Sequence, residues 1–517
     1  MTRRRIPPRG PNLPRRRMQP DSRYTVSRRQ LLKGAGGVAG LAALGGGAFG
    51  AVRALGGSSR LPRIDSALSD AGSSAREFVS RPDLRPPVVS VTGTGAADGY
   101  MLVSPFPRDG SQPGPLMFDG SGQPMWFRPL PGLRATNFQA GRYRDQPVLL
   151  WWEGTIPKGY GQGEAVIVDS SYRELARIRA GNDRQMDLHE LLLTPQGTVL
   201  FTCFPEDVTA DLSKIGGPTS GTVRQSIIQE VDVRTGQLML EWRSLEHVDV
   251  SESYASLDDQ FDYLHANSID VAPDGNLLIS ARHTFALYKL DRRTGRVIWR
   301  LGGKQSDFRM GADSQFFWQH DARALGADMI TVFDDGAGPA KDESQSRAIV
   351  LQMDEPARTV RLVRSYRHPN PLLADAMGSA RTLPNGHVIV GWGTEPYVSE
   401  FAPDGRLLAD AHLESGSASY RAFRHPWQGR PSEPPVAASK RGADGESSLY
   451  VSWNGATNVA YWQLSRGSTP DALRPVGLAE HRGFETVIPL RTADGYARAT
   501  AVDAAGRGMA SSRVVRL

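Results

Sequence analysis

A four-residue turn followed by a short apolar run recurs through the middle of this sequence and constrains the fold more than any other feature. Each copy has proline at the first central position of the turn and glycine where a positive φ is needed. A β-rich run such as Asn276–Ser280 or His387–Gly391 follows. The pattern predicts repeated β-hairpins. The four turns are at residues 194–197, 272–275, 383–386 and 402–405.

A second repeated element joins an Asp-led turn to a strand that ends in tryptophan. Residues 232–236 run on to Trp242, and residues 291–295 run on to Trp299. This spacing is typical of the blades of a β-propeller, and these tryptophans, with Trp318, are expected to pack within the blades. An array of β-sandwiches is the structural alternative. Because the copies are imperfect, they do not reveal the number of blades.

Composition divides the rest of the chain around the propeller, which we place at residues 87–430 of an all-β protein. Residues 57–86 are polar, carry a faint helical pattern over 64–78 and are interpreted as a spacer. Proline, serine, alanine and charged residues predict a linker over 431–446. Residues 447–517 contain short β-like runs and candidate core tryptophans, which predict a fibronectin- or immunoglobulin-like β-sandwich.

The first 56 residues form a basic segment of a different kind. Arg28 and Arg29 precede a leucine pair, Lys33 and a glycine-diluted apolar stretch over 34–52, which together resemble a twin-arginine signal. We therefore expect recognition by the twin-arginine export machinery and a secreted, periplasmic or cell-surface location. The apolar stretch is long enough to span a bilayer, so membrane attachment is expected only if the signal is retained as an anchor.

Charge and cysteine content exclude several classes of function. The chain carries a net charge of +6, but residues 1–33 carry +10, so the remainder carries −4. The body of the protein therefore has no basic stripe suited to nucleic acid. Cys203 is the only cysteine, which rules out an intrachain disulfide and a cysteine-based zinc site. Its apolar surroundings indicate a buried structural thiol.

Histidines in distinctive local settings are the strongest candidates for chemistry. The sequence has no Walker loop, no zinc-protease motif and no G-x-S-x-G elbow. His265 and Arg282 flank the turn at 272–275 at similar distances, so a hairpin there brings them toward one end of a sheet. Together with Asn267, they would form a pocket for an oxyanion.

Seven segments are specific when they are taken together: DLHELLLTPQGTVLF, IIQEVDVRTGQLMLEWRSLEHV, FDYLHANSIDVAPDGNLLISARHT, RRTGRVIWRLGGKQSDF, FFWQHDARAL, SQSRAIVL and VSWNGATNVAYW. They resemble the bacterial arylsulfotransferases that work without a nucleotide sulfate donor. The resemblance covers about residues 87–465. It implies a six-bladed propeller with its site at the central channel.

The resemblance also implies roles for individual residues. The family forms a covalent sulfohistidine, and the histidine of its Q-H motif matches His320. Its H-x-N motif matches His265 and Asn267, and the arginine on the next strand matches Arg282. These three residues are expected to hold the sulfuryl oxygens. His189 matches the histidine of a D-x-H segment and is expected to move the phenol proton.

The expected reaction uses a small-molecule aryl sulfate as donor and a phenol as acceptor, with ping-pong kinetics and neither a metal nor a cofactor. His283 and Arg347 are expected to line the substrate pocket. A non-catalytic propeller that binds ligands or cell-surface partners, and an aryl sulfate hydrolase with water as acceptor, are the alternatives. Structural roles also stay open for Asn267, as a turn cap, and for Arg282, as an ion-pair partner.

Overall fold

The computed structural model describes residues 61–69, 76–337, 344–414, 417–442, 445–490 and 494–517. The regular structure of these ranges is β-strand with short 3-10 helices, so the prediction of an all-β fold is confirmed. No helix in the described ranges is long and apolar enough to cross a membrane. The predicted signal segment falls outside them. The 3-10 helices are η1 (Pro157–Gly159), η2 (Ser213–Ile215), η3 (Ser244–Glu246), η4 (Val250–Glu252), η5 (Arg282–Thr284) and η6 (Ala312–Ser314).

Between residues 100 and 425, the described strands belong to five sheets, and the eight-stranded sheet divides by chain order into two groups of four, which gives six antiparallel units of four. In five units the strands follow chain order, whereas the remaining unit begins with a strand from the end of the region. The units are β28 (Ala418–His425), β4 (Tyr100–Phe106), β5 (Leu116–Phe118) and β6 (Pro124–Phe127); β7 (Arg134–Tyr143), β8 (Gln146–Thr155), β9 (Gln162–Val168) and β10 (Glu174–Ile178); β11 (Met186–Leu193), β12 (Thr198–Ala210), β13 (Gly221–Asp232) and β14 (Leu238–Arg243); β15 (Ala266–Val271), β16 (Leu277–Ala281), β17 (Ala286–Leu290) and β18 (Val297–Gly302); β20 (His320–Ala324), β21 (Met329–Asp334), β22 (Arg347–Asp354) and β23 (Thr359–Tyr366); and β24 (Ser379–Thr382), β25 (Val388–Gly391), β26 (Tyr397–Phe401) and β27 (Leu407–Leu413).

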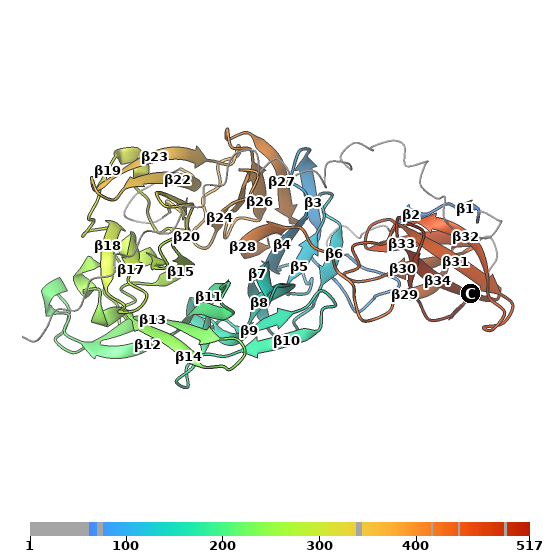
Figure 1. Cartoon of the computed structure of the whole chain (residues 1–517), viewed down its shortest axis with the longest axis horizontal. Helices are drawn as coiled ribbons and strands as arrows, with labels where there is room; N and C mark the ends of the chain where they lie inside the picture. Colours follow the sequence, from blue (N-terminus) through green and yellow to red (C-terminus); the bar gives the residue numbers. More distant parts are fainter. Residues whose placement is uncertain (1–60, 70–75, 338–343, 415–416, 443–444, 491–493) are drawn as a thin grey trace, which may run out of the picture. The chain divides into compact units, whose positions relative to one another are not determined.

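The first strands of these units form a closed ring. β7 contacts β11, β11 contacts β15, β15 contacts β20, β20 contacts β24, β24 contacts β28, and β28 contacts β7. Figure 1 shows the units around a common centre. The propeller-like fold is therefore confirmed, and we interpret the six units as its blades.

The ring closes because strands from the two ends of the region share sheets. β28 pairs with β4, with Ala422 opposite Val103. β3 (Val89–Gly93), which comes before β4 in the chain, pairs with β27, so it belongs to the sheet of β24 to β27. A further short strand, β19 (Arg309–Met310), lies parallel to β23. The sheet shared by β28 and β4 thus joins the two ends of the propeller region.

The tryptophan repeat packs neighbouring blades together. The Asp232 carboxylate accepts a 2.8 Å hydrogen bond from the main-chain N–H of Thr235 and so closes its turn. Trp242 lies at the end of the following strand and donates a 3.1 Å hydrogen bond to the carbonyl of Gly295, in the second copy of that turn. Trp242 and Trp299 are both buried, as predicted.

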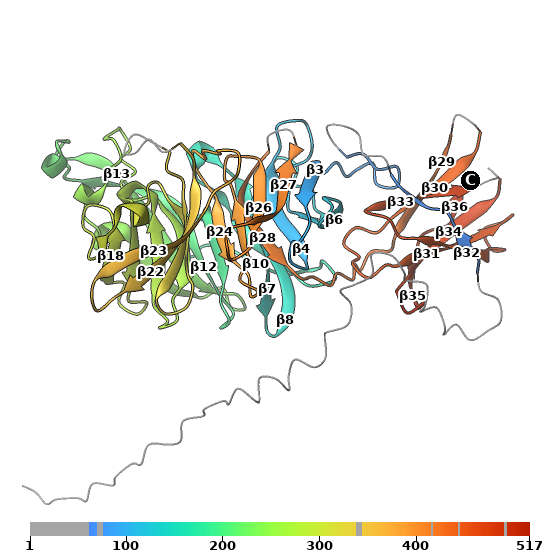
Figure 2. The same ribbon diagram turned by 90° about the horizontal axis from the view of Figure 1, so that it is seen from above.

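The C-terminal region consists of two sheets with a common core. One joins β30 to β33, and the other joins β31 to β32 and β34 (Figure 2). Leu449 and Ile488 of the first sheet pack in one cluster with Trp462 and Ala499 of the second. The sheets are β2 (Ala67–Leu68), β33 (Glu485–Leu490), β30 (Ser447–Ser452) and β29 (Val436–Arg441); and β1 (Arg63–Ile64), β32 (Arg474–Glu480), β31 (Tyr461–Gly467), β34 (Tyr496–Val502), β35 (Gly508–Ser511) and β36 (Val515–Arg516).

Two segments differ from the sequence-based expectations. Strands β1 and β2 occupy part of the predicted spacer, 57–86, where a faint helical pattern was expected, and each pairs with a C-terminal strand. β29 lies inside the predicted linker, 431–446. All three strands lie at sheet edges with exposed or half-buried side chains, so they lack the apolar alternation by which a strand is recognised. The immunoglobulin or fibronectin type of the C-terminal region stays a prediction.

Candidate active site

The innermost strands of the propeller and the segments beside them contain irregular backbone. The pairing register shifts within β7, β11, β15, β20 and β28, five of the innermost strands. Such β-bulges re-aim side chains and are common beside active sites. Several residues there also have positive φ, which costs a non-glycine residue roughly 1–3 kcal/mol. They are Asn137 (55°), His265 (56°), Phe285 (50°), Trp318 (57°), Asp321 (52°) and Met377 (69°).

Three of the predicted site histidines lie side by side. The ring centroids of His189 and His265 are 4.8 Å apart, and those of His265 and His283 are 4.7 Å apart. His189 is on β11, whereas His265 directly precedes β15 and His283 is in η5. The hydroxyl of Tyr160 lies 2.7 Å from Nδ1 of His265. Different blades therefore contribute imidazoles to one cluster.

His320, the first residue of β20, lies next to this cluster. The ring of Tyr420 makes edge-on contacts with both His320 and His189, with centroid distances of 6.4 Å and 5.7 Å. His320 is 2% exposed, and its Nδ1 lies 2.7 Å from the Asp335 carboxylate. Burial, reinforced by the positive charge of Arg282, holds the pKa of His320 well below its usual range. Its imidazole is therefore neutral at neutral pH.

Gln319, the residue before His320, holds the start of β20 in place. Its side-chain amide donates hydrogen bonds to the carbonyls of Ala281 and Ala286, at 3.0 and 3.2 Å, and so anchors β20 to the preceding blade. The main-chain carbonyl of Gln319 accepts a 2.7 Å hydrogen bond from the Asn267 amide. These contacts fix the backbone from which the His320 side chain projects.

Asn267 therefore has a structural partner that the sequence did not reveal. Its side chain is fully buried, and one amide N–H is used to hold Gln319, although the sequence pointed to a sulfuryl oxygen. Its Oδ1 has no hydrogen-bond partner among the described residues. The geometry favours a role in positioning β20, and contact with a sulfuryl group stays a prediction.

Arg282 presents a cation next to the histidines. Its guanidinium lies 4.6 Å from the centre of the Trp318 ring and donates a 2.9 Å hydrogen bond to the carbonyl of Asp375. Its Nη1 lies 3.1 Å from Nε2 of His283. Within the described ranges, Nε of Arg282 and Nε1 of Trp318 are both buried without a hydrogen-bond partner. Two N–H donors are thus available to an anion.

Trp318 also belongs to the site, although the tryptophan pattern predicted only a packing role for it. It is buried, as predicted, but it also stacks on Arg282 and contacts the His283 ring edge-on at 5.5 Å. Its positive φ, rare for a bulky residue, turns the side chain toward these groups.

Arg347 is held by groups outside the histidine cluster. Its guanidinium donates hydrogen bonds to the Asp334 carboxylate at 2.8 Å and to the carbonyl of Gln315 at 2.7 Å. It is buried at the start of β22. These contacts fit a structural role, and its predicted place in the substrate pocket stays a prediction.

Sequence reasoning did not assign the carboxylates behind the histidines. Asp187 lies 2.5 Å from Nδ1 of His189, and Asp262 lies 2.7 Å from Nδ1 of His265. The i, i+2 spacing of Asp187 and His189 on one strand was a usable signal, because such residues share a face. Asp335 is remote from His320 in sequence and gave no such signal.

Asp262, His265 and His283 also have metal-ligand atoms within 4.8 Å of one another. The 2.7 Å separation of Asp262 Oδ2 and His265 Nδ1 matches a hydrogen bond. Two ligands of a tetrahedral Zn²⁺ would be about 3.3 Å apart, given Zn–N bonds of about 2.0–2.1 Å. The observed spacing therefore fits a carboxylate–imidazole pair better than a pair of metal ligands.

A buried network of charges also lies among the innermost strands. Glu190, Asp321, Arg323, Arg381 and Arg421 come from four of these strands and form short ion pairs with one another. Arg421 also bonds Asn137 on β7 and the carbonyl of Asn267 on β15. All six innermost strands are therefore connected through this network.

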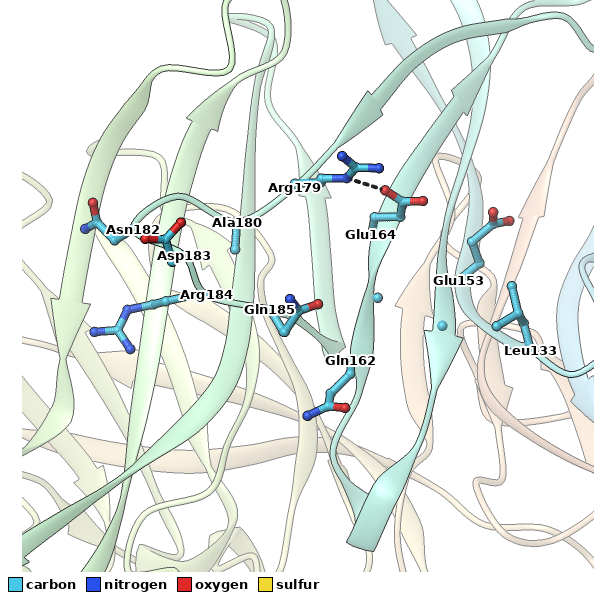
Figure 3. A pocket seen from close by; sticks show the side chains of 12 residues that line it. Leu133, Glu153, Gln162, Glu164, Arg179, Ala180, Asn182, Asp183, Arg184 and Gln185 are labelled. Carbon is cyan, nitrogen blue, oxygen red and sulfur yellow. Dashed lines mark hydrogen bonds and ion pairs between the residues drawn. The ribbon is translucent and has the colours of Figure 1, made fainter.

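A hollow of about 710 Å³ lies between β9 and the segment 179–185 (Figure 3). Its walls are polar, and Arg179 pairs with Glu164 across it at 2.8 Å. None of the lining residues belongs to the histidine cluster. We therefore place the candidate active site at the cluster and not at this hollow.

Comparison with solved structures gives distant likenesses. A protein of unknown function from Bacteroides caccae is 13% identical, with a TM-score of 0.37, over 63% of this chain and 98% of its own. Virginiamycin B lyase from Staphylococcus aureus is 9% identical, with a TM-score of 0.33, over 78% and 99%. The periplasmic gluconolactonase of Pseudomonas aeruginosa is 12% identical, with a TM-score of 0.34, over 81% and 96%.

Comparison with protein families is more informative. No curated protein matches the chain. Residues 140–414, more than half of the chain, match the arylsulfotransferase (ASST) family. The matched region contains His189, His265, His283 and His320, together with Arg282. The chain belongs to the arylsulfotransferase family.

Proposed function

We propose that the protein transfers a sulfuryl group from an aryl sulfate to a phenol, with His320 as the temporary carrier. Family membership supports arylsulfotransferase activity in general. The observation that supports His320 as carrier is a neutral, buried imidazole backed by Asp335, beside Arg282 and two unpartnered N–H donors. A neutral imidazole is a competent nucleophile.

In the first half-reaction, an imidazole nitrogen of His320 uses its lone pair to form a bond to sulfur. The sulfur–oxygen ester bond breaks, and its electron pair leaves on the aryl oxygen as phenolate. His189 is proposed to protonate that oxygen. Arg282, His265 and the Trp318 indole N–H are proposed to bind the sulfuryl oxygens, where charge is concentrated during transfer.

In the second half-reaction, a phenol occupies the place that the first phenol has left. His189 takes its proton, the phenolate oxygen attacks sulfur, and the electron pair of the nitrogen–sulfur bond returns to His320. Donor and acceptor are chemically alike, so one pocket can serve both if the enzyme holds the sulfuryl group between them. This scheme uses the protein's own side chains throughout.

Incubation of purified protein with p-nitrophenyl sulfate, with and without an added phenol, tests the proposal. Release of p-nitrophenol that depends on the phenol supports transfer. Release without it indicates a hydrolase, and no release favours a binding propeller. Protein quenched with donor alone should gain about 80 Da on the peptide that contains His320. A label on another residue would refute the carrier assignment.

We also propose that the protein acts after twin-arginine export, in a secreted, periplasmic or cell-surface location, with the membrane as a partner only if the signal segment is retained. The supporting observation is the Arg28-Arg29 pair ahead of the glycine-rich apolar stretch.

A further inference from the structure

The two ring nitrogens of His320 have different surroundings. Nδ1 lies 2.7 Å from Oδ2 of Asp335, and that carboxylate is fully buried. Nε2 lies 3.3 Å from the main-chain N–H of Met377, which points at it. Because an N–H group can only donate, Nε2 must accept, so the single proton of the neutral imidazole is on Nδ1.

We propose that Asp335 is a positioning residue that holds His320 in the Nδ1–H tautomer and so keeps Nε2 unprotonated, with a lone pair that attacks sulfur once the 3.3 Å hydrogen bond from the Met377 N–H breaks. This inference rests on the proposed function. Without a fixed acceptor at Nδ1, the proton could equally occupy Nε2, and Nε2 would then have no lone pair for bond formation.

The position of Asp335 is itself fixed from two sides. Asp335 follows the last residue of β21, whose Phe333 is paired with His320 in the sheet. The hydroxyl of Ser346 donates a 2.6 Å hydrogen bond to the carbonyl of Asp335. The carboxylate therefore approaches the imidazole from a neighbouring strand of the same blade.

The same orientation recurs among the other site histidines. His189 and His265 also turn Nδ1 toward an aspartate, Asp187 and Asp262 respectively. In contrast, His368, in an outer part of the propeller, turns Nε2 toward Asp410 at 3.0 Å. Outside the site, His387 also turns Nδ1 toward a carboxylate, that of Glu400 at 2.7 Å, so the pairing is shared by the site histidines without being confined to them.

Asp335 also matches the charge that the reaction creates. When Nε2 bonds to sulfur, the ring keeps its proton on Nδ1 and becomes an imidazolium. The Asp335 carboxylate, 2.7 Å away, then faces a positive charge, which strengthens the hydrogen bond. When the acceptor phenolate removes the sulfuryl group, the electron pair returns to Nε2 and the ring is neutral again.

The variant Asp335→Asn tests this role, because an amide N–H can donate to Nδ1 and so move the imidazole proton to Nε2. Donor turnover should fall about 10⁴-fold in kcat, the scale measured for the equivalent change in a serine-protease triad. The KM for the donor should change far less. Asp410→Asn, which disturbs a partly buried Asp–His pair outside the site, should leave kcat unchanged.

The spectroscopic test does not depend on activity. In protein labelled with ¹⁵N-histidine, long-range ¹H–¹⁵N spectra should show His320 protonated at Nδ1 in the wild type and at Nε2 in Asp335→Asn. A wild-type Nε2–H signal, or an Asp335→Asn loss no larger than that of Asp410→Asn, would overturn the proposal. If Asp335→Asn does not fold, the wild-type spectrum decides alone. A wild type that shows the Nδ1–H tautomer without turnover would refute the proposed function and not the tautomer.

Discussion

The substitution Arg421→Met probes the buried charge network most directly. The Arg421 side chain is fully buried and lies 2.7 Å from the Glu190 carboxylate and 3.1 Å from that of Asp321. It also donates hydrogen bonds of 2.6 Å to the Asn137 side chain and 2.9 Å to the Asn267 carbonyl. Methionine fills a similar volume without the charge, so mainly the polar contacts are lost.

The expected loss of stability depends on which groups Arg421→Met leaves without a partner. Glu190 and Asp321 keep Arg323 as a partner, but the Asn137 side chain and the Asn267 carbonyl each lose a donor. Removing one partner from a buried ion pair costs about 3–5 kcal/mol. At about 2 °C per kcal/mol for a large domain, Tm should fall by about 6–10 °C.

Arg177→Met provides the matched control. Arg177 also contacts three carboxylates, those of Glu153, Glu164 and Glu174, but its side chain is 27% exposed. Solvent-exposed ion pairs contribute about 0–1 kcal/mol each, so the loss of all three should lower Tm by about 6 °C at most. Thermal unfolding followed by circular dichroism measures both variants. If Arg421→Met lowers Tm by no more than Arg177→Met does, a stabilising role for the network is refuted.

Three further predictions concern the site, acid stability and export. Arg282→Ala should lower kcat/KM for p-nitrophenyl sulfate about 100-fold or more, the scale for a lost oxyanion donor; less than about 5-fold would exclude it from that role. Lowering pH from 7 to 5 should lower Tm. Burial lowers the pKa of His283 to about 3 and that of His481 to about 4, so below about pH 6.5 the unfolded chain binds more protons. His481→Gln should reduce this loss, and an unchanged loss would contradict the assignment. Replacing Arg28 and Arg29 by lysine should leave precursor inside cells on immunoblots, and undiminished export would contradict the signal.

The features that sequence reasoning predicted depend on short-range chemistry. The turn at 194–197 forms because Pro195 and Gly197 suit its backbone, and Gly197 donates a 3.0 Å hydrogen bond to the Thr194 carbonyl. The approach of His265 to Arg282 follows from the hairpin between them, and the Arg282 N–H bonds the His265 carbonyl at 3.0 Å. Both relations lie within a few residues of a recognisable turn.

The features that it missed depend on pairings between distant segments. Residue 63 pairs with residue 478, and neither short strand of the N-terminal segment has an apolar pattern of its own. Asp335 meets His320 only after β20 and β21 pair in a register broken by a bulge. His320 is itself buried, with its imidazole beside that carboxylate. Its replacement by alanine would leave the Asp335 carboxylate without its imidazole, so an effect on folding as well as on turnover is now expected.

The location of the site can be argued without reference to any family. The innermost strands contain bulges, and His265, Trp318 and Asp321 on or beside them have positive φ, which is unfavourable for non-glycine residues. Each such position costs free energy, so it persists only if the surrounding contacts determine it. The network around Glu190 and Arg421 supplies such contacts from every innermost strand. The buried ion pairs therefore hold the strained backbone in place, and that backbone positions the imidazoles of the site.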